Sequence, residues 1–355
     1  MRINEILTGQ TTPRKMAKSL FICSILLLLN SFLSFRSSAT NLAYSTPFDR
    51  WFFKVFGDEN IKSVHNGTVA KISLDQKTGS EFVSSDIFLH GYFSASIKLP
   101  RNQDTAGVVV AFFTMNQDIY SRNQDEATFE FLGNVKGKEW VVQTNIHGNT
   151  TIRNSTSKGR EERYTLWFDP SADFHKYSIL WTENHIIFYV DDVPIRLFMR
   201  TKAIGNYFIT SPMYVYGSIR DGSDWATDGG KQKVDYKYAP FTAAFSELIL
   251  LGCPADPIDL KPYCIDEDPW EKKVPTGLTR KDITQMRRFR HKFMTYSYCF
   301  DKERYPVTPP ECFVDGREME PPQNFDPVVF GGDPVEKWRR DFYWVFSRVF
   351  RLIFV

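Results

Sequence analysis

The stretch NQDEATFEFLG, residues 123–133, alternates polar and apolar side chains, which is the pattern of a β-strand with one apolar face. Side chains at i, i+2 and i+4 lie on the same side of a strand. One side carries Glu126, Thr128 and Glu130, and the other carries Ala127, Phe129 and Phe131. The apolar set predicts contact with a core, and the polar set places two carboxyl groups on the opposite face.

Similar segments follow one another through most of the chain. Runs rich in β-branched and aromatic residues occupy 91–99, 106–115, 138–146, 175–181, 185–195 and 212–219. Turn-forming clusters separate these runs, and no helical period passes through them. Residues 40–255 are therefore predicted to form one all-β domain, a sandwich or jelly roll.

The composition changes near Cys253, where a proline-rich, loop-like segment begins. Residues 279–298 then place four apolar side chains on one helical stripe, namely Ile283, Met286, Phe289 and Phe293. Thr279 and Asp282 resemble a capping box. We expect a short C-terminal extension, residues 256–315, that contains one helix, and a disordered tail, residues 316–355. The end of this tail could lie on a membrane surface, add to a partner or be non-essential.

The N-terminus has the features of a secretory signal peptide, predicted over residues 1–39. Arg14, Lys15 and Lys18 precede an apolar run over 20–35, and small residues follow it at 37–39. A transmembrane anchor is the alternative, but a span usually needs about 20 apolar residues and this run is shorter. Met16 is a possible alternative start. The sequence therefore predicts a secreted, extracellular protein with no membrane span.

Four cysteines remain beyond the signal region, at Cys253, Cys264, Cys299 and Cys312. Four cysteines allow three pairings, of which the nearest-neighbour one, Cys253 with Cys264 and Cys299 with Cys312, closes two short loops. A zinc site is the rival interpretation, but the spacings lack the paired C-x-x-C form, and secretion favours disulfides. Sequons at Asn66, Asn149 and Asn154 predict glycosylation, although each alone is a weak signal.

The charge balance argues against some classes of partner. The formal net charge is +2, so no strong field is available to attract nucleic acid or a membrane surface. The histidines do not cluster at ligand spacing and no glycine-rich phosphate loop is present, so we expect neither a metal nor an organic cofactor. Aromatic residues make up 15% of the chain, which suits an all-β fold and a sugar-binding surface.

Two carboxyl groups on one side of a strand admit two interpretations. The simpler one is a solvent-exposed polar face, which is common in antiparallel sheets. The other is glycosidic bond cleavage, in which one carboxylate attacks or activates water and the other protonates the leaving oxygen. Cα atoms at i and i+4 are about 13 Å apart on a strand, whereas a retaining enzyme needs carboxyl groups about 5–5.5 Å apart. Only inward-leaning side chains on a curved strand would close that gap.

The segment DEATFEFLGN resembles the active-site strand of plant xyloglucan endotransglucosylase/hydrolases, in the sixteenth family of glycoside hydrolases. The likeness covers nearly the whole mature chain and includes the segments GSEFVSSDIFLHGYFSASIKLP, QTNIHGN, GREERYTLWFDPSADFHKYSILW, SDWATDGGKQKVDYKYAPF and YSYCFDKERYP. GREERY and the extended C-terminus are most similar to the family's third group. The resemblance implies a concanavalin-like β-jelly-roll sandwich with a substrate cleft, a C-terminal extension that lengthens the cleft, and a retaining mechanism.

The resemblance also implies roles for individual residues. Glu126 matches the nucleophile and Glu130 the general acid/base. The residues that match sugar-binding positions are Gln143, Thr144, Asn145, Gly159, Arg160, Glu161, Asp224, Trp225, Gly230 and Arg304. Turn chemistry and surface packing are the alternative explanation for these polar residues, and for Gly230 that explanation is nearly as good.

The chain departs from the family pattern at four positions of the proposed site. The family strand usually has histidine, isoleucine and aspartate where this chain has Gln124, Ala127 and Thr128, and relatives usually have tryptophan at Arg220. A threonine can donate a hydrogen bond to Glu126 but supplies no charge, so Glu130 would lose its proton at a lower pH. An arginine stacks on a sugar less well than an aromatic ring does.

Three functions remain compatible with these residues. The first is a secreted cell-wall enzyme, a monomer, that cleaves and religates xyloglucan through a glycosyl-enzyme intermediate. The second is a catalytically impaired relative that binds wall glucan without turnover. The third is a β-glucan hydrolase of broader specificity.

Overall fold

The computed structural model describes residues 47–116, 119, 124–148, 159–264, 270–314 and 317–318. The predicted signal peptide and nearly all of the predicted tail lie outside these residues, as do Asn149 and Asn154. Two short helices, seven 3-10 turns and seventeen strands are found within the described ranges.

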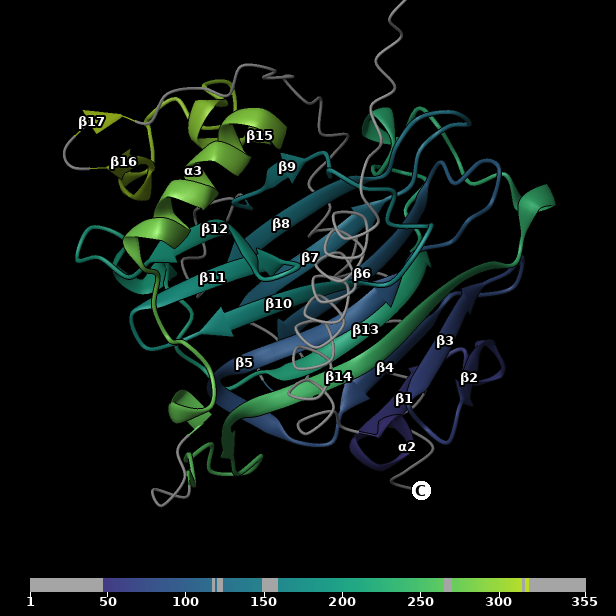
Figure 1. Cartoon of the computed structure of the whole chain (residues 1–355), viewed down its shortest axis with the longest axis horizontal. Helices are drawn as coiled ribbons and strands as arrows, with labels where there is room; N and C mark the ends of the chain where they lie inside the picture. Colours follow the sequence, from purple (N-terminus) through teal and green to yellow (C-terminus); the bar gives the residue numbers. More distant parts are fainter. Residues whose placement is uncertain are drawn as a thin grey trace, which may run out of the picture. The chain divides into compact units, whose positions relative to one another are not determined.

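Two antiparallel sheets make up the body of the fold (Figure 1). The first sheet has the strand order β1 (Phe52–Phe56), β4 (Ser80–Ser84), β13 (Tyr214–Asp221), β6 (Val108–Met115), β7 (Glu126–Leu132), β8 (Val141–His147), β9 (Glu162–Tyr164) and β15 (Met294–Ser297). The second has the order β12 (Val193–Met199), β11 (His185–Val190), β10 (His175–Trp181), β5 (Ile87–Lys98), β14 (Phe241–Ala255), β3 (Val69–Leu74) and β2 (Ile61–Val64). The sandwich predicted from the sequence is thus confirmed.

The remaining elements are short. They are α2 (Phe48–Trp51), α3 (Arg280–Phe293), a small hairpin of β16 (Phe313–Val314) and β17 (Arg317–Glu318), and the 3-10 turns η1 (Asp58–Asn60), η2 (Gly205–Tyr207), η3 (Asp228–Gly230), η4 (Tyr236–Tyr238), η5 (Trp270–Lys272), η6 (Tyr298–Phe300) and η7 (Pro310–Cys312). The one helix predicted for the C-terminal extension is α3.

The core lies between the two sheets, and β7 contributes one whole side to it. Ala127, Phe129 and Phe131 are fully buried there. The ring of Phe129 lies 5.6 Å from that of Tyr177 and 5.2 Å from that of Phe188, both on the second sheet. These edge-to-face contacts join the sheets at their centre, because aromatic pairs prefer this geometry and bury large areas. The period-two prediction for residues 123–133 is therefore correct on its apolar side.

The predicted turn cluster of Asp191 and Asp192 divides the run 185–195 into β11 and β12, and both residues adopt left-handed conformations (φ 47° and 63°). The helical stripe over 279–298 is too long: α3 ends at Phe293, and β15 begins at Met294. Met294 turns to extended backbone because β15 pairs with β9 at the edge of the first sheet.

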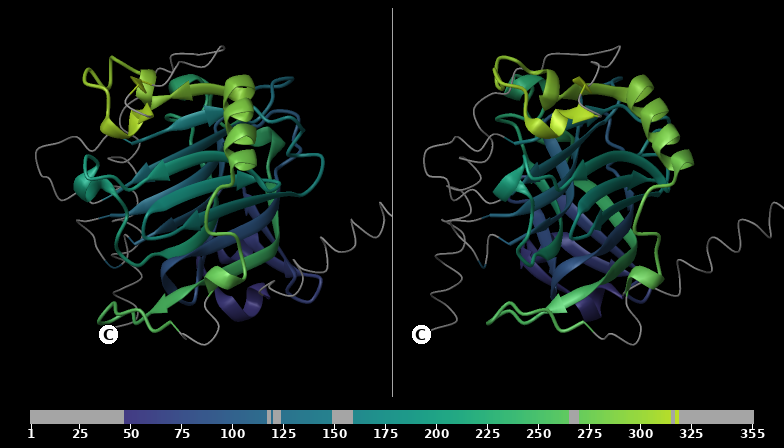
Figure 2. Two further views of the ribbon diagram at one scale, coloured as in Figure 1. Left: turned by 60° about the vertical axis from the view of Figure 1, so that its left-hand side comes forward. Right: turned by 90° about the vertical axis from the view of Figure 1, so that its left-hand side faces the viewer.

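The start of α3 follows its sequence signal. Thr279 accepts a hydrogen bond from the backbone N–H of Asp282, and the Asp282 side chain accepts one from the backbone N–H of Thr279, which is a complete capping box. Met286 and Phe289 of the predicted stripe are buried. The helix packs against β12 and leads directly into β15, so it connects the two sheets at one side (Figure 2).

A buried ion pair fixes α3 to the first sheet. Arg290 donates to both carboxylate oxygens of Glu162 on β9, at 2.5 and 2.8 Å. The guanidinium of Arg196 on β12 lies 3.5 Å from the same carboxylate. Burial opposes ionisation of Glu162, but the two arginines outweigh it and lower the pKa of Glu162 to about 2. The carboxylate therefore stays charged at every ordinary pH.

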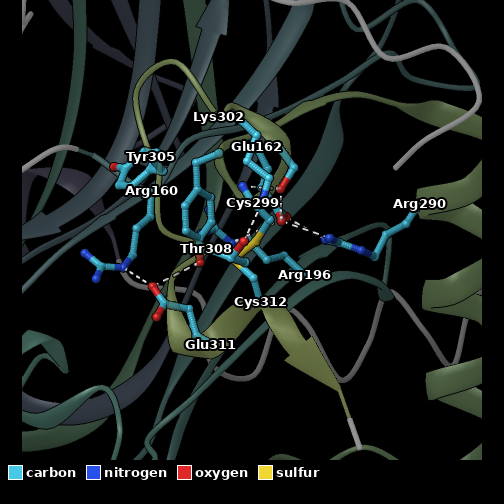
Figure 3. Close-up of a disulfide and its surroundings, with 12 residues drawn as sticks. Arg160, Glu162, Arg196, Arg290, Cys299, Lys302, Tyr305, Thr308, Glu311 and Cys312 are labelled. Atoms are coloured by element: carbon cyan, nitrogen blue, oxygen red, sulfur yellow. Dashed lines mark hydrogen bonds and ion pairs between the residues drawn. A yellow bond between two sulfur atoms is a disulfide. The ribbon is translucent and has the colours of Figure 1, made fainter. Parts of the chain in front are cut away.

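Two disulfides tie down the extension. Cys253 is bonded to Cys264 and Cys299 to Cys312, which is the nearest-neighbour pairing. Figure 3 shows the second bridge with Arg160 and Glu311 on one side of it and Arg290 directed at Glu162 on the other. The first bridge joins the extension to β14 and the second lies within the extension, while the contact of the extension with β9 is the ion pair of Arg290 and Glu162.

We expect Arg290→Met to lower the free energy of unfolding by about 3 kcal/mol, since it leaves a buried carboxylate with a weaker partner. Urea denaturation at pH 7 would measure the change. Arg287→Met, an exposed position of the same helix, is the matched control and should change stability by less than about 0.5 kcal/mol. A depressed carboxyl pKa gives stability that is lost as the pH falls through it, so the difference should shrink as the pH approaches 2. Equal stability of the two variants would contradict this role of the ion pair.

Candidate active site

The side of the first sheet that faces away from the core, here called the outer face, carries the polar side chains of β7. Strand register places residues of neighbouring strands in rows across this face. One row consists of Glu81, Ser218, Ala111, Glu130, Gln143 and Arg163. The next consists of Val83, Tyr216, Phe113, Thr128 and Asn145, and a third of Tyr214, Met115, Glu126 and His147. The two glutamates are therefore separated by the row that contains Thr128.

Glu130 lies in a hydrogen-bonded chain that runs across three strands. Its side chain is recessed, with the residue 9% exposed. Gln143 Nε2 donates to Glu130 Oε2 at 2.5 Å, and Arg163 Nε donates to Gln143 Oε1 at 2.6 Å. This chain holds the carboxyl group of Glu130 in one position.

Glu126 is less enclosed than Glu130. Its side chain is partly exposed, and it forms no hydrogen bond or ion pair with any of the residues that the structure describes. Glu126 and Glu130 lie on the same face of β7, and the charge of Glu130 raises the pKa of Glu126. Glu126 thus remains available to a ligand on the outer face.

Burial is the main cause of a raised pKa at both carboxyl groups. It raises the pKa of Glu126 to about 8, with Glu130 and Glu161 adding to the effect and Arg220 opposing it. It raises the pKa of Glu130 to about 7, where Glu161 adds to the effect while the hydrogen bond from Gln143 and the charge of Arg163 oppose it. Two interacting carboxyl groups that hold protons near neutral pH are the arrangement expected for general acid–base chemistry.

Thr128 supplies neither a charge nor a hydrogen bond to the glutamates on either side of it. Its side chain is buried, and its hydroxyl donates to the backbone carbonyl of Phe129 at 3.2 Å. The hydrogen bond to Glu126 considered from the sequence is not formed. The position between the two carboxyl groups is therefore electrostatically neutral in this chain.

Arg220 is engaged in an ion pair on the outer face. Its Nη2 contacts a carboxylate oxygen of Glu81 on β4, and its guanidinium lies 5.1 Å from the ring centre of Phe56. The side chain of Glu81 is fully buried and that of Arg220 is 18% exposed. The planar head that the sequence analysis considered as a sugar platform is thus held by Glu81.

The three predicted sugar-binding residues of β8 do not share one face. Gln143 and Asn145 lie on the outer face, where Asn145 Nδ2 contacts His147 Nε2 at 2.9 Å. The side chain of Thr144 lies on the opposite side, where Arg196 donates to its hydroxyl at 2.9 Å and to its carbonyl at 3.0 Å. Alternation along the strand therefore separates Thr144 from the other two.

The predicted group at 159–161 and Arg304 contact the extension. Arg304 donates to both carboxylate oxygens of Glu161, at 3.0 and 3.2 Å. Arg160 is ion-paired with Glu311, and its guanidinium lies 4.7 Å from the ring centre of Tyr207. Tyr305 donates its hydroxyl to the carbonyl of Gly159. These four residues dock the extension, and Glu161 also contributes its charge to both catalytic candidates.

The third predicted group lies beyond β13. Trp225 packs against an apolar cluster of Val109, Leu132, Val141 and Ala226. Asp224 is exposed and lies 3.4 Å from the Nζ of Lys233. Gly230 has φ +85°, and a Cβ there would meet the Asp224 carbonyl oxygen at 2.2 Å, so the turn itself requires glycine.

Sequence reasoning missed Glu81 and Arg163, which both belong to the row that contains Glu130. Each is a charged residue within a strand, and each is nearly or fully buried. A charged residue at a strand position whose neighbours alternate in polarity is the signal that could have identified them.

Asn66, the one sequon asparagine within the described ranges, is exposed in the turn between β2 and β3.

The described residues contain neither a metal-binding cluster nor a membrane-spanning helix. No group of three or more metal-binding side chains occurs among them. None of their helices has the length and apolar character needed to cross a membrane.

Comparison with known families gives two matches. Residues 48–238 match the glycosyl hydrolases of family 16, and residues 263–312 match the C-terminus of xyloglucan endo-transglycosylases.

Relatives with similar sequences cover most of the chain. A probable xyloglucan endotransglucosylase/hydrolase, protein 28 of Arabidopsis thaliana, is 49% identical over 315 residues, which is 88% of this chain and 93% of that protein. Protein 27 of the same plant is 52% identical over 289 residues, 81% of this chain and 85% of that protein. Among solved structures, a prokaryotic β-1,3-1,4-glucanase (lichenase) from a mouse hindgut metagenome has 24% identity and a TM-score of 0.45, covering 57% of this chain and 94% of that one.

We expect Glu126→Gln to stabilise the protein at alkaline pH. A raised carboxyl pKa gives stability that is present below the ordinary value of 4.5 and lost as the pH rises to about 8. The variant should match the wild type at pH 4.5 and exceed it by roughly 1–2 kcal/mol at pH 8, a value reduced by partial exposure of the side chain. Glu59→Gln, at an exposed carboxylate, is the control. Thermal melts at the two pH values would measure the effect, and a gain of the same size at pH 4.5 would contradict it.

Proposed function

Because the chain belongs to the xyloglucan endotransglucosylase/hydrolase family, within the glycosyl hydrolases of family 16, we propose that it cleaves and religates xyloglucan by a retaining mechanism. The observation that carries this proposal is the pair of interacting carboxyl groups, Glu126 and Glu130, on the outer face of one strand. One of them is held by an amide donor and the other is open to a ligand.

In the first step, the carboxylate of Glu126 attacks the anomeric carbon of a bound glucan. The bond to the glycosidic oxygen breaks, and Glu130 gives its proton to that oxygen as the reducing-side fragment leaves. A glycosyl ester on Glu126 remains. The step requires Glu130 protonated, which its raised pKa favours. It also requires Glu126 ionised, which the charge of Arg220 favours but the burial of Glu126 and the charge of Glu130 oppose.

In the second step, Glu130 acts as a base. It takes the proton of an incoming hydroxyl group, from another glucan chain or from water, while that oxygen bonds to the anomeric carbon and the ester bond to Glu126 breaks. The hydrogen bond from Gln143 favours the ionised form of Glu130 that this step needs. The same residue thus serves as acid and then as base.

The remaining site residues receive roles in the same proposal. Gln143, Asn145 and Glu161 lie on or beside the outer face near Glu130, and we assign them to the sugar-binding surface together with Trp225, Asp224, Gly230 and Arg304. Thr144, Gly159 and Arg160 would support that surface from behind, through Arg196 and the extension.

We also propose where the protein acts and how its chain is divided. Two disulfides support secretion to the cell wall, since such bonds persist in oxidising compartments. Residues 1–39 would be the signal peptide, 40–255 the catalytic domain, 256–315 the extension and 316–355 a tail, with glycans at Asn66, Asn149 and Asn154. The protein would act as a monomer.

One assay separates the possible activities. Purified mature protein is mixed with xyloglucan and a labelled xyloglucan oligosaccharide. Label entering the polymer supports transfer, and chain shortening without incorporation supports hydrolysis. Retention of the protein on xyloglucan with neither result would replace the proposal with a glucan-binding function.

Glu126→Gln and Glu130→Gln should each reduce turnover by at least 10³-fold while largely preserving retention on xyloglucan, because they remove the attacking group and the proton donor but keep side-chain shape. Initial rates of label transfer would measure the loss. Glu59→Gln should transfer label at the wild-type rate. Persistent activity in Glu126→Gln would remove that residue from the nucleophile's role.

Thr128→Asp should raise turnover, by about tenfold or more. A carboxyl group at this position can hydrogen-bond to Glu126 and add a negative charge beside Glu130, neither of which the threonine hydroxyl provides. The extra charge should move the basic limb of the pH–rate profile upward, because Glu130 would keep its proton to a higher pH. Thr128→Asn, which adds no charge, is the control. An unchanged rate and profile in Thr128→Asp would contradict this account of the position.

A further inference from the structure

We propose that Arg163 is a positioning residue for the acid/base Glu130, acting through the side-chain amide of Gln143. This inference rests on the proposed function, in which Glu130 exchanges a proton with the glycosidic and acceptor oxygens. The three residues lie opposite one another on β7, β8 and β9, in a single row of the outer face.

The orientation of the Gln143 side-chain amide decides whether Arg163 and Glu130 can both form hydrogen bonds with it. A glutamine side chain has an acceptor oxygen on one side and a donor NH₂ group on the other, whereas a guanidinium only donates. Because Arg163 Nε donates to Gln143 Oε1 at 2.6 Å, the NH₂ group of Gln143 must face the other way. There it meets the Glu130 carboxyl at 2.5 Å. Reversing the amide would leave Arg163 facing a second donor and Glu130 facing an acceptor oxygen.

The side chains of Gln143 and Arg163 are buried, so water does not readily replace the hydrogen bonds that join Arg163, Gln143 and Glu130. Gln143 is 3% exposed and Arg163 is 8% exposed. A buried donor or acceptor that loses its partner carries the full desolvation cost, and this penalty fixes the amide in one orientation. Arg163 is itself kept charged by nearby acids: burial lowers its pKa, but Glu161 and Glu130 oppose that shift.

Several charged groups surround Glu130 and must be separated from the effect of the amide. Glu126 lies on the same strand, Glu161 and Arg163 lie on or next to β9, and Ala111 of β6 adds no charge. From the extension, Arg304 is paired with Glu161, and Tyr296 of β15 acts on Arg163. Arg163 thus affects Glu130 in two ways, by its charge and by the orientation it gives to Gln143.

The test separates these two ways by substituting each partner alone and both together. The readout is the pKa of the Glu130 carboxyl, from carbon-13 NMR titration of protein labelled at its glutamate side chains, with Glu130→Gln to identify the signal. Gln143→Leu should raise this pKa by about one pH unit, since it removes a hydrogen bond to the ionised form. Arg163→Lys keeps the charge but places a methylene where Nε lies, so it should raise the pKa by a smaller amount.

The decisive comparison is Arg163→Lys in the Gln143→Leu background. If Arg163 acts through the amide, the lysine variant has no further effect there, because no amide remains to be oriented. An equal rise in both backgrounds, or no rise in either, would overturn the inference. Arg287→Lys on the exposed side of α3 is the matched control and should leave the pKa of Glu130 unchanged.

A second variant covers the case in which the lysine protein does not fold. Arg163→Met removes the charge as well as the donor, so it should raise the pKa in both backgrounds and by more where Gln143 is present. An identical rise in the two backgrounds would again overturn the inference. In active protein, the basic limb of the pH–rate profile should follow the same pattern.

The experiment distinguishes a failure of the proposed function from a failure of this inference. The NMR titration needs no substrate, so a wild-type protein without turnover still reports whether Arg163 and Gln143 are coupled. Conversely, a protein that transfers label but shows independent effects of the two substitutions keeps the proposed function and loses only this inference.

Discussion

The pleat of β7 determines where the site and the core lie relative to each other. Adjacent side chains of one strand point in opposite directions, so a single seven-residue strand supplies Phe129 to the core and Glu130 to the outer face. The aromatic contacts of Phe129 with Tyr177 and Phe188 hold the backbone, and the backbone holds the carboxyl group. Any change that moved the phenylalanine rings would also move the acid, because both are attached to the same few peptide units.

The first sheet carries buried acidic residues on both of its sides, and the two sides differ in how completely arginine compensates their charge. On the core side, Glu162 is ion-paired with Arg290 and Arg196, which lower its pKa to about 2 and keep it charged at ordinary pH. On the outer face, Glu126 and Glu130 have fewer compensating partners, and their pKa values rise into the range in which protons are exchanged. Buried acids of one chain can therefore be structural or reactive according to how completely arginine neutralises them.

Local sequence patterns predicted the features that depend on neighbouring residues. The alternation of 126–131 identified both faces of β7, and Thr279 with Asp282 marked the first turn of α3. Features that depend on distant partners were not predictable in this way. The helix ends before Met294 because β15 pairs with β9 there, and Arg220 is held by Glu81, 139 residues earlier in the chain. The direction of the Thr128 hydroxyl is a rotamer choice, which a period-two pattern does not encode.

The position of β15 has a consequence for how the protein is made. β9 has only three residues, and its outer partner, together with the arginine that fixes Glu162, comes from a part of the chain about 128 residues further on. Contacts of such long sequence separation form slowly, because much chain must be ordered before they are made. During synthesis, β9 can pair with its second neighbouring strand only after the residues of β15 have been made. The edge of the sheet next to Arg163 is therefore completed only by a segment near the end of the described chain.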